Sequence, residues 1–560
     1  MRWLLIPLVL CFASSSHAAS HPPLFAKGGM VAADNAAASQ VGAHILEQGG
    51  DAADAAVAVA LYLGVVQPFA SGIGGGGFAV VHRVGGPAYA LDFREMAPQA
   101  AHRDMYLDAE GQVITGLSTS GPKASGVPGE VAGLYELHRR HGKLAWSNVV
   151  MPALKAARDG FPVGQLLHQR IRAYRQRIVD RPAFRAQFFD ASGQALAIGA
   201  TLIRPNLART LSAIAEHGAD GFYAGPVAAE IARVMAADGG LITQADLAAY
   251  TVKERPLVRD TVMGFDVLSM PPPSSGGAVI VATLKALVGA PLKEDGHNSS
   301  AYLHRLAEAL KHTFADRARV MGDPDFTDVP LESLLGEAST QRIKQAYHPE
   351  HTLARDAYGG RYTIPDDGGT SHFSVVDSSG NAVALTTTVN TGFGSQYIAG
   401  NTGIVMNNEM DDFVSKPGIP NAFGLIGNAA NAVAPKKRPL SSMSPTIVLE
   451  NGRIRLVVGA SGGPTIITGT LQVMLNVLVF GMDIREAIEA PRIHHQWVPE
   501  ILWMEQGIPA DVRTALQRRG HSTKVRPRYN SVQGIERAPE GWFGASDPAK
   551  LGAPAGAAAR

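Results

Sequence analysis

One stretch of the chain, residues 366–390, places polar side chains at the spacing of a β-strand. Its sequence, DDGGTSHFSVVDSSGNAVALTTTVN, has two strand-forming segments separated by Ser-Ser-Gly, and this pattern predicts a β-hairpin. A three-residue loop that ends in a left-handed glycine sets Thr370 opposite Thr388. Further along the strands it sets His372 opposite Thr386. Because side chains alternate between the faces of a strand, we expect one face to carry five polar residues: Thr370, His372, Thr386, Thr388 and Asn390.

A threonine at the start of a strand can act as a nucleophile when it is an N-terminal residue. Its own α-amine, with an ordinary pKa of about 7.7–8.0, then takes up the hydroxyl proton near neutral pH. Gly368 and Gly369 precede Thr370 and give the backbone the freedom that a self-cleaving peptide bond requires. An ordinary glycine-containing loop that enters a strand has the same local sequence. From the hairpin alone we favour the ordinary loop, because short motifs often match by chance.

Three other segments carry groups that could bind a charged substrate. Arg94 follows a predicted strand in LDFREMAP, either as a surface ion pair or as a bidentate donor to a carboxylate. Glu409, Asp411 and Asp412 crowd one turn, which indicates an ammonium pocket or a cation site, although the spacing of a calcium loop is missing. The turn GASGGPT, residues 459–465, joins a strand to a helix and presents backbone N–H groups to an oxyanion or a phosphate. Since no lysine follows, we favour the oxyanion.

Composition and charge exclude some classes of function. The 560 residues include 50 Lys and Arg against 49 Asp and Glu, a formal net charge of +1, which gives no reason to expect a nucleic acid or an anionic membrane as partner. The adjacent His494 and His495 point in different directions and no third ligand is suggested. We therefore predict no metal and no cofactor.

The first residues indicate export. Arg2 precedes an apolar run and small residues end at Ala19, the pattern of a signal peptide over residues 1–19 rather than a membrane span, which needs about 20 apolar residues. The expected location is periplasmic or secreted. Cys11, in this leader, is the only cysteine, so the mature protein has no disulfide and no thiol chemistry.

The remaining pattern predicts the elements that position these groups. Residues 30–63 read as two Ala-rich helices, the second capped by Asp51 and buried on nearly all sides. The middle third, residues 123–321, is mostly helical. The Gly, Pro and Asn-rich segment 415–442 is too long for an ordinary connection and is interpreted as a lid. The Gly-Ala-rich tail from Leu551 is expected to fray.

Taken in order, the motifs resemble those of a known family. They are GGDAADAAVA, SGIGGGGF, LDFREMAP, GVPGEVAG, PPPSSGG, GGTSHFSVVD, TTTVNTGFG, NNEMDDF, RPLSSMSPTIV, GASGG and PRIHHQW. With them the chain resembles the γ-glutamyltransferases, self-processing threonine hydrolases that act on glutathione. The resemblance covers almost the whole chain after the leader. It implies an α/β (α+β) fold, the four-layer αββα sandwich of the N-terminal-nucleophile hydrolases, with largely helical additions in the large subunit.

The resemblance also implies roles for individual residues. The precursor would cut itself between Gly369 and Thr370 into a large subunit, 20–369, and a small catalytic subunit, 370–560, which stay associated. Thr370 would be nucleophile and base, and Thr388 would hydrogen-bond it and assist processing. The other implied site residues fall into three groups: Gly462 and Gly463 for the oxyanion hole; Arg94, Ser441 and Ser442 for the α-carboxylate of the γ-glutamyl group; and Asn390, Glu409 and Asp412 for its α-amino group.

Three positions depart from the family pattern. Ser371 stands where relatives commonly have a second threonine, and little effect is expected. In the lid, Phe423 stands where many bacterial relatives carry a tyrosine, so the gating and the balance between hydrolysis and transfer are open. GASDPAK lacks the arginine usual after Ser-Asp-Pro, and Ala549 occupies that position.

The sequence therefore predicts an exported γ-glutamyltransferase and glutathione hydrolase. The substrates would be glutathione, other γ-glutamyl compounds, and amino acid or peptide acceptors. One alternative is an acylase of the same fold that acts on glutaryl or cephalosporin-type side chains, but such donors lack the α-amine that Asn390, Glu409 and Asp412 would bind. The other alternative is a catalytically silent periplasmic binding protein, against which the intact Thr370 and Thr388 argue.

Overall fold

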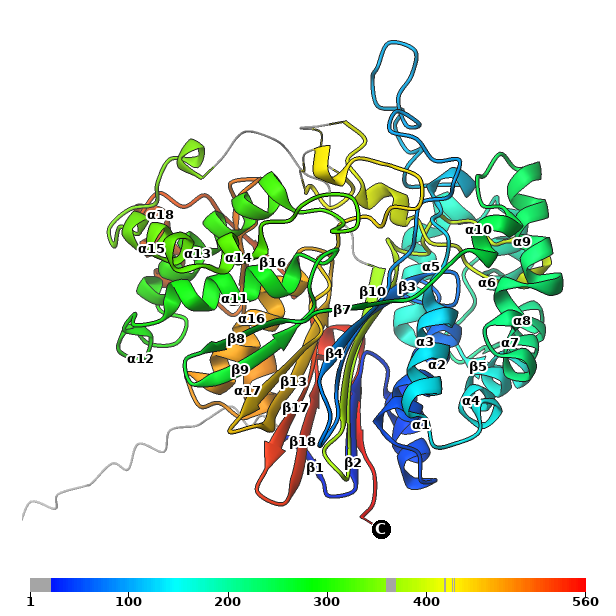
Figure 1. The fold of residues 1–560 in the computed structure, drawn as a ribbon, viewed down its shortest axis with the longest axis horizontal. Helices are drawn as coiled ribbons and strands as arrows, with labels where there is room; N and C mark the ends of the chain where they lie inside the picture. The colour runs from blue at the N-terminus through cyan, green and yellow to red at the C-terminus, as the bar shows by residue number, and fades with distance from the viewer. Residues whose placement is uncertain are drawn as a thin grey trace, which may run out of the picture.

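The computed structural model describes residues 22–358, 369–416, 419, 421–425, 427 and 429–559. The predicted signal peptide, 1–19, and residues 366–368 of the hairpin lie outside the described residues. Figure 1 shows two β-sheets that face each other at the centre of the molecule, with helices on both outer sides. Among the described helices, none is long and apolar enough to cross a membrane.

Both large sheets have seven strands with antiparallel pairing throughout. The strands of one sheet are, in spatial order, β1 (Leu24–Ala26), β18 (Gly541–Ser546), β17 (Ser531–Ala538), β13 (Arg453–Ser461), β12 (Thr446–Glu450), β9 (Phe265–Ser269) and β8 (Val258–Val262). Those of the other are β19 (Ala553–Gly556), β2 (Gly29–Ala33), β10 (Gly369–Asp377), β11 (Ala382–Asn390), β3 (Gly76–His82), β4 (Tyr89–Phe93) and β7 (Lys253–Arg255). Strands from both ends of the chain therefore build each sheet.

Helices cover the outer face of each sheet (Figure 1). On the side of β10 and β11 lie α1 (Ala36–Glu47), α2 (Ala52–Val66), α3 (Glu130–His141), α4 (Trp146–Asp159), α5 (Gln165–Ile178), α6 (Pro182–Phe188), α7 (Pro205–His217), α8 (Asp220–Tyr223), α9 (Gly225–Ala237) and α10 (Gln244–Ala248). On the side of β13 lie α11 (Gly276–Leu287), α12 (Leu292–Asp295), α13 (Ser300–Val320), α14 (Leu331–Leu335), α15 (Glu337–Ala346), α16 (Thr465–Leu478), α17 (Ile484–Glu489) and α18 (Ala510–Arg518). The short strands β14 (Ile493–His494), β15 (Leu502–Glu505) and β16 (Thr523–Arg526) form a third sheet, and β5 (Phe161–Pro162) pairs with β6 (Thr201–Leu202).

Three hydrophobic cores separate the four layers. The core between the two sheets includes Met30, Val80 and Val376 from one sheet and Leu268 and Ile535 from the other. A second core lies between the β10–β11 sheet and helices such as α2, which is buried along its length and capped at Asp51 as predicted. The third lies between the β13 sheet and helices α11, α13 and α16. This arrangement confirms the predicted αββα sandwich.

The hairpin β10–β11 has the predicted register. Gly380 is left-handed with φ of 86°, the amide of Asp377 bonds to the carbonyl of Asn381, and Thr370 faces Thr388. His372 faces Thr386, and its Nδ1 lies 2.8 Å from the Thr386 hydroxyl. One feature was not predicted: the register shifts between Gly369 and Thr370, because Gly369 pairs with Asn390. The extra residue, Val389, lies on β11, so β11 bulges opposite the peptide bond that is predicted to be cleaved.

The prediction of a frayed C-terminal tail is wrong. Residues Ala553–Gly556 form β19, which pairs with β2 through Ala553 opposite Ala33. β19 covers the otherwise open edge of β2, so the backbone groups of both strands gain hydrogen-bond partners. Small side chains are suited to this edge because they pack closely against neighbouring residues.

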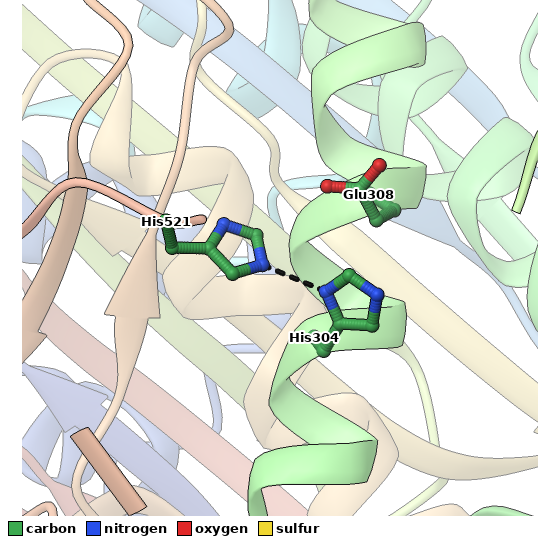
Figure 2. A group of neighbouring side chains, drawn as sticks. All are labelled: His304, Glu308 and His521. Carbon is green, nitrogen blue, oxygen red and sulfur yellow. Dashed lines mark hydrogen bonds between the residues drawn. The ribbon is translucent and has the colours of Figure 1, made fainter. Parts of the chain in front are cut away.

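A buried polar cluster joins α13 to residues far along the chain (Figure 2). His304 Nδ1 lies 2.7 Å from His521 Nε2, and His304 Nε2 lies 2.7 Å from the carbonyl of His348. Glu308, one turn along α13, accepts hydrogen bonds from Thr352 and Lys311. One potential ligand atom from each of His304, Glu308 and His521 lies within 4.8 Å of the others. Both nitrogens of His304 and the Glu308 carboxylate already have hydrogen-bond partners, whereas His521 Nδ1 has none among the described residues. The Lys311 ammonium also balances the charge of Glu308, so the cluster is a structural clamp.

Candidate active site

A narrow pocket opens where β10 and β11 approach the loop segments that follow β11 and precede α16. It is lined by ten of the residues selected from the sequence: Arg94, Thr370, Thr388, Asn390, Glu409, Asp412, Phe423, Ser441, Ser442 and Gly463. Two further candidates adjoin lining residues: Gly462 precedes Gly463, and Gly369 precedes Thr370. Segments that are up to 369 residues apart in the sequence are therefore brought together around Thr370.

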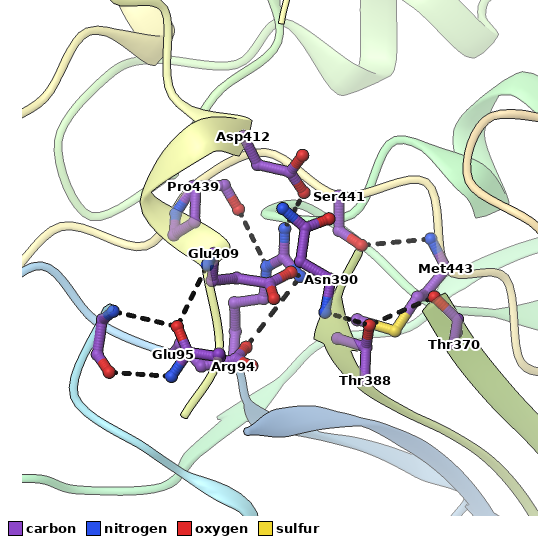
Figure 3. Close-up of polar contacts among 12 residues, drawn as sticks. Arg94, Glu95, Thr370, Thr388, Asn390, Glu409, Asp412, Pro439, Ser441 and Met443 are labelled. Atoms are coloured by element: carbon purple, nitrogen blue, oxygen red, sulfur yellow. Dashed lines mark hydrogen bonds and ion pairs between the residues drawn. The ribbon is translucent and has the colours of Figure 1, made fainter. Parts of the chain in front are cut away.

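The two threonines form a connected set of hydrogen bonds with the backbone (Figure 3). The Thr388 hydroxyl donates to the carbonyl of Gly369 over 2.8 Å and accepts from the amide of Asn390 over 2.8 Å. The hydroxyl oxygens of Thr370 and Thr388 lie 3.1 Å apart. Because Thr388 has one proton and gives it to Gly369, the proton in the threonine contact belongs to Thr370. Thr388 thus orients the Thr370 hydroxyl and polarises the carbonyl that precedes it.

Arg94 is buried at the base of the pocket and contacts both candidate acids (Figure 3). It is 1% exposed, its Nη1 bonds to Glu409, and its Nη2 lies 2.5 Å from Asp412 Oδ2. The structure therefore excludes a surface ion pair for Arg94. One guanidinium and two carboxylates in close contact can bind a ligand that carries both a carboxylate and an ammonium. The ligand carboxylate would then pair with the guanidinium, and the ligand ammonium with the protein carboxylates.

Three other polar candidates differ in the hydrogen bonds that their side chains form. The Ser442 hydroxyl is buried and has no hydrogen-bond partner among the described residues, whereas Ser441 Oγ accepts from the amide of Met443 over 3.1 Å. Asn390 has a left-handed backbone, with φ of 77°, and its side chain donates to the carbonyl of Asn408 over 3.0 Å. A ligand could therefore supply the hydrogen bond that Ser442 lacks, and Glu409 Oε2 is likewise without a partner among the described residues.

The turn after β13 is formed by two glycines with positive φ. Gly462 and Gly463 have φ values of 130° and 56°, which glycine adopts without strain. They precede α16, whose first amides, those of Thr465 and Ile466, donate to the carbonyls of Gly462 and Gly463 over 3.2 and 3.1 Å. A side chain at Gly463 would begin 2.7 Å from the ring of Phe423. The Phe423 ring therefore packs against this turn.

Asp411, the third acid of the turn, points away from the others. It accepts from the Ser118 hydroxyl over 2.6 Å and from the amide of Ala422 over 2.7 Å. Asp411 therefore holds the loop that carries Phe423, while Glu409 and Asp412 pair with Arg94. The separate engagement of the three acids favours the charge-binding interpretation of this turn over the calcium interpretation.

Two buried glutamates behind the pocket were not selected from the sequence. Glu95 and Glu130 are at most 1% exposed, and their carboxyl oxygens form no hydrogen bond within the described residues. Burial raises the pKa of each to about 8, because desolvation disfavours a carboxylate. For Glu95, burial outweighs the opposite effect of Arg94, whose Nη1 lies 3.9 Å away. Both glutamates are therefore protonated at neutral pH. The sequence signal was weak, since acids beside an arginine or at the start of a helix are usually solvated.

We predict that replacing Glu130 by glutamine stabilises the protein increasingly as pH rises from 4.5 to 8. The unfolded chain loses the Glu130 proton near pH 4.5 and the folded protein near pH 8. The wild type therefore loses stability over this window, by up to about 1.4 kcal/mol per pH unit. Glutamine does not titrate, so the difference between variant and wild type grows and becomes constant above pH 8.

Urea unfolding of both proteins at pH 5, 6, 7 and 8 measures this difference. Glu136→Gln is the matched control on the same helix, because hydrogen bonds from Arg139 lower the pKa of Glu136. Its difference from the wild type should stay constant between pH 6 and 8. A constant difference for Glu130→Gln would mean that Glu130 is ionised in the folded protein.

Two further residues near Thr370, Asp34 and Lys550, were not predicted from the sequence. Lys550 donates hydrogen bonds to the carbonyl of Thr370 and, over 3.0 Å, to Asp34. Lys550 directly follows Ala549, the position where the arginine of the family pattern is missing. Their separation of 516 residues in the chain leaves no local pattern from which the pair could be predicted.

Comparison with known proteins adds to this geometry. A family model described as gamma-glutamyltranspeptidase matches residues 38–557. The chain is 44% identical over 528 residues to the glutathione hydrolase proenzyme of Escherichia coli strain K12, with 94% of this chain and 91% of that protein covered. It is 39% identical over 577 residues to glutathione hydrolase 2 of Arabidopsis thaliana, with 98% and 97% covered.

Solved structures give the same fold. A cephalosporin acylase from Bacillus halodurans superposes with a TM-score of 0.85 at 27% identity, covering 99% of this chain and 100% of that chain. A gamma-glutamyltranspeptidase from Helicobacter pylori superposes with a TM-score of 0.56 at 39% identity, covering 58% of this chain and 92% of that chain. Because the family model spans most of the sequence and the relatives exceed 30% identity over most of their length, this chain belongs to the gamma-glutamyltranspeptidase family.

Proposed function

We propose that this protein is a self-processing enzyme that transfers the γ-glutamyl group of glutathione and related compounds to water, amino acids or peptides. One observation carries the proposal: Thr370, 3.1 Å from Thr388, lies beside a pocket that holds a buried cation and two carboxylates. The relatives named glutathione hydrolase support the substrate class.

In the proposed processing step, the Thr370 hydroxyl attacks the carbonyl carbon of Gly369. The C–N bond between the two residues breaks, the nitrogen gains the proton that the hydroxyl loses, and an ester forms on Thr370 Oγ1. Water then hydrolyses this ester and leaves a carboxylate on Gly369 and a free amine on Thr370. The 2.8 Å hydrogen bond from Thr388 to the Gly369 carbonyl supports the step, because it stabilises the developing negative charge.

In the proposed catalytic cycle, the new amine of Thr370 takes the hydroxyl proton and Oγ1 attacks the γ-carbonyl of the donor. The oxyanion would be held by the backbone N–H groups of Gly462 and Gly463. The donor amide bond breaks, its nitrogen takes a proton, and a γ-glutamyl ester remains on Thr370. Water or the amine of an acceptor then resolves the ester and regenerates the hydroxyl.

The charges of the pocket suit the two ends of a γ-glutamyl group. Arg94, with Ser441 and Ser442, would hold the α-carboxylate, while Glu409 and Asp412, with Asn390, would hold the α-ammonium. The unpartnered Ser442 hydroxyl supports this assignment, since a carboxylate would satisfy it. Phe423 would close the pocket by ring contact, without the hydrogen bond that a tyrosine could add.

The relatives named as proenzymes support processing of one precursor into associated subunits. We place the cut at Gly369–Thr370, with a large subunit of residues 20–369 and a small one of residues 370–560. We also place the mature enzyme in the periplasm or outside the cell, on the basis of the leader sequence. N-terminal sequencing of both subunits purified from the exported fraction would test the boundaries.

An acylase for glutaryl or cephalosporin-type donors is less favoured. The structural similarity to a cephalosporin acylase is extensive, but the identity to that protein is 27%, against 44% to the glutathione hydrolase proenzyme of E. coli. The acids Glu409 and Asp412 would have no ammonium to bind in a glutaryl donor.

We expect the purified enzyme to hydrolyse glutathione to glutamate and cysteinylglycine. With a dipeptide acceptor it should also form the γ-glutamyl dipeptide, which mass spectrometry distinguishes from the hydrolysis products. Faster cleavage of a glutaryl anilide than of a γ-glutamyl anilide would favour the acylase. Absence of both self-cleavage and turnover would favour a silent binding protein.

A further inference from the structure

We propose that Lys550, held by Asp34, is a positioning residue that fixes the backbone of Thr370 for self-cleavage and for catalysis. The inference rests on the proposed function, because it requires Thr370 to be the nucleophile. It concerns two residues that lie outside the pocket lining.

The pair substitutes for a missing section of β-sheet. β10 is paired with β2 only from Phe373 onward, because β2 ends at Ala33. The carbonyl of Thr370 and the amide of His372 point to the same side of β10, where β2 offers no partner. Lys550 donates to this carbonyl, and Asp34 Oδ2 accepts from this amide over 3.3 Å. Two side chains therefore continue the hydrogen-bond ladder to the first residue of the proposed small subunit.

Asp34 also connects β10 to the opposite sheet. It accepts from the hydroxyls of Ser461 and Ser531 over 3.1 and 2.9 Å and from the Gln533 side chain over 2.6 Å. Ser461 is the last residue of β13 and directly precedes the Gly462-Gly463 turn. The carboxylate of Asp34 thus fixes the spacing between the strand that carries the nucleophile and the turn that would hold the oxyanion.

The need for this support increases after cleavage. In the precursor, Thr370 is held covalently on both sides, whereas in the processed enzyme it is a chain end, and chain ends fray unless they are tied down. Displacement of a reacting atom by about 1 Å can reduce a rate by about 10²-fold. Asp34 is fully buried and Lys550 is 8% exposed. The Asp34–Lys550 pair is therefore held rigidly, and each charge is balanced by the other.

The test compares variants that separate positioning from charge balance. Lys550→Met removes the donor but leaves Asp34 unpaired, so its stability is expected to fall. The double variant Asp34→Asn/Lys550→Met removes both charges and is expected to recover stability. We expect both variants to process slowly and, once processed, to show kcat reduced by about 10²-fold with the KM for the γ-glutamyl anilide unchanged. Lys550→Arg, which keeps a cationic donor, should recover much of both rates.

The matched control is Lys311→Met, which removes another buried ammonium, 3.1 Å from Glu308 on α13. It should lose stability but process and turn over like the wild type. Wild-type rates in the double variant, or a loss of kcat in step with stability across all variants including the control, would overturn the inference. A wild type that neither cleaves itself nor turns over would instead refute the proposed function.

Discussion

Replacement of Thr370 by alanine is expected to leave the protein as one uncut chain without measurable turnover. Alanine has no hydroxyl to attack the carbonyl of Gly369, and the processed N-terminal nucleophile never forms. By analogy with other nucleophile deletions, the loss of kcat should be on the order of 10⁴-fold or more. Denaturing electrophoresis and intact mass measure processing, and release of nitroaniline from a γ-glutamyl anilide measures turnover.

Two further variants make this result specific to the hydroxyl. Thr370→Ser retains a nucleophile and should process and turn over at reduced rates. Ser371→Ala removes the neighbouring hydroxyl, which lies on the opposite face of β10 and 3.4 Å from the Ser71 hydroxyl. It should behave like the wild type. A Thr370→Ala protein that is cut before residue 370 would place the nucleophile elsewhere.

The register of the central hairpin could be predicted because it depends on local rules. The left-handed Gly380 and the alternation of side chains determine which residues face each other, and the structure confirms Thr370 opposite Thr388. The bulge of β11 opposite Gly369 could not be predicted in this way. It depends on Asn390, whose left-handed backbone is supported by contacts with Asn408.

Interactions between distant segments account for most of what the sequence did not reveal. Lys550 and Asp34 meet because β2 ends at Ala33, directly before Asp34. Where this strand ends depends on the whole sheet and not on the local sequence. The same sheet orders the C-terminal tail, since β19 needs the free edge of β2. The candidate pocket residues were found because the family resemblance supplied the long-range information that spacing lacks.

Substitution of Arg94 by glutamine is expected to impair γ-glutamyl donors far more than donors that lack the α-carboxylate. Truncation of one partner in a buried, hydrogen-bonded charge pair costs about 2–5 kcal/mol, or roughly 30-fold to several thousand-fold in kcat/KM for a γ-glutamyl anilide. A 4-aminobutyryl anilide keeps the amine but has no α-carboxylate. Its kcat/KM should therefore fall much less.

The ratio of the two donors, rather than either rate alone, tests the role of Arg94. Arg94 also balances the buried charges of Glu409 and Asp412, so its loss is expected to destabilise the folded protein and lower all rates together. Arg438→Gln is the control, because Arg438 is an equally buried arginine that pairs with Asp92 over 2.7 Å and does not line the pocket. Arg438→Gln should lower kcat/KM for the γ-glutamyl anilide and for the 4-aminobutyryl anilide by the same factor.

The opposite end of the pocket gives the reciprocal expectation. Glu409→Gln should reduce use of the γ-glutamyl anilide more than use of a glutaryl anilide, which keeps the carboxylate but lacks the amine. Together, Arg94→Gln and Glu409→Gln assign the α-carboxylate of the donor to the arginine and its α-amine to the glutamate. A general loss of structure would lower kcat/KM for all donors and would not select the donor that lacks one particular group. If Arg94→Gln lowers kcat/KM for the γ-glutamyl and 4-aminobutyryl donors by the same factor, Arg94 supports the pocket without binding the α-carboxylate.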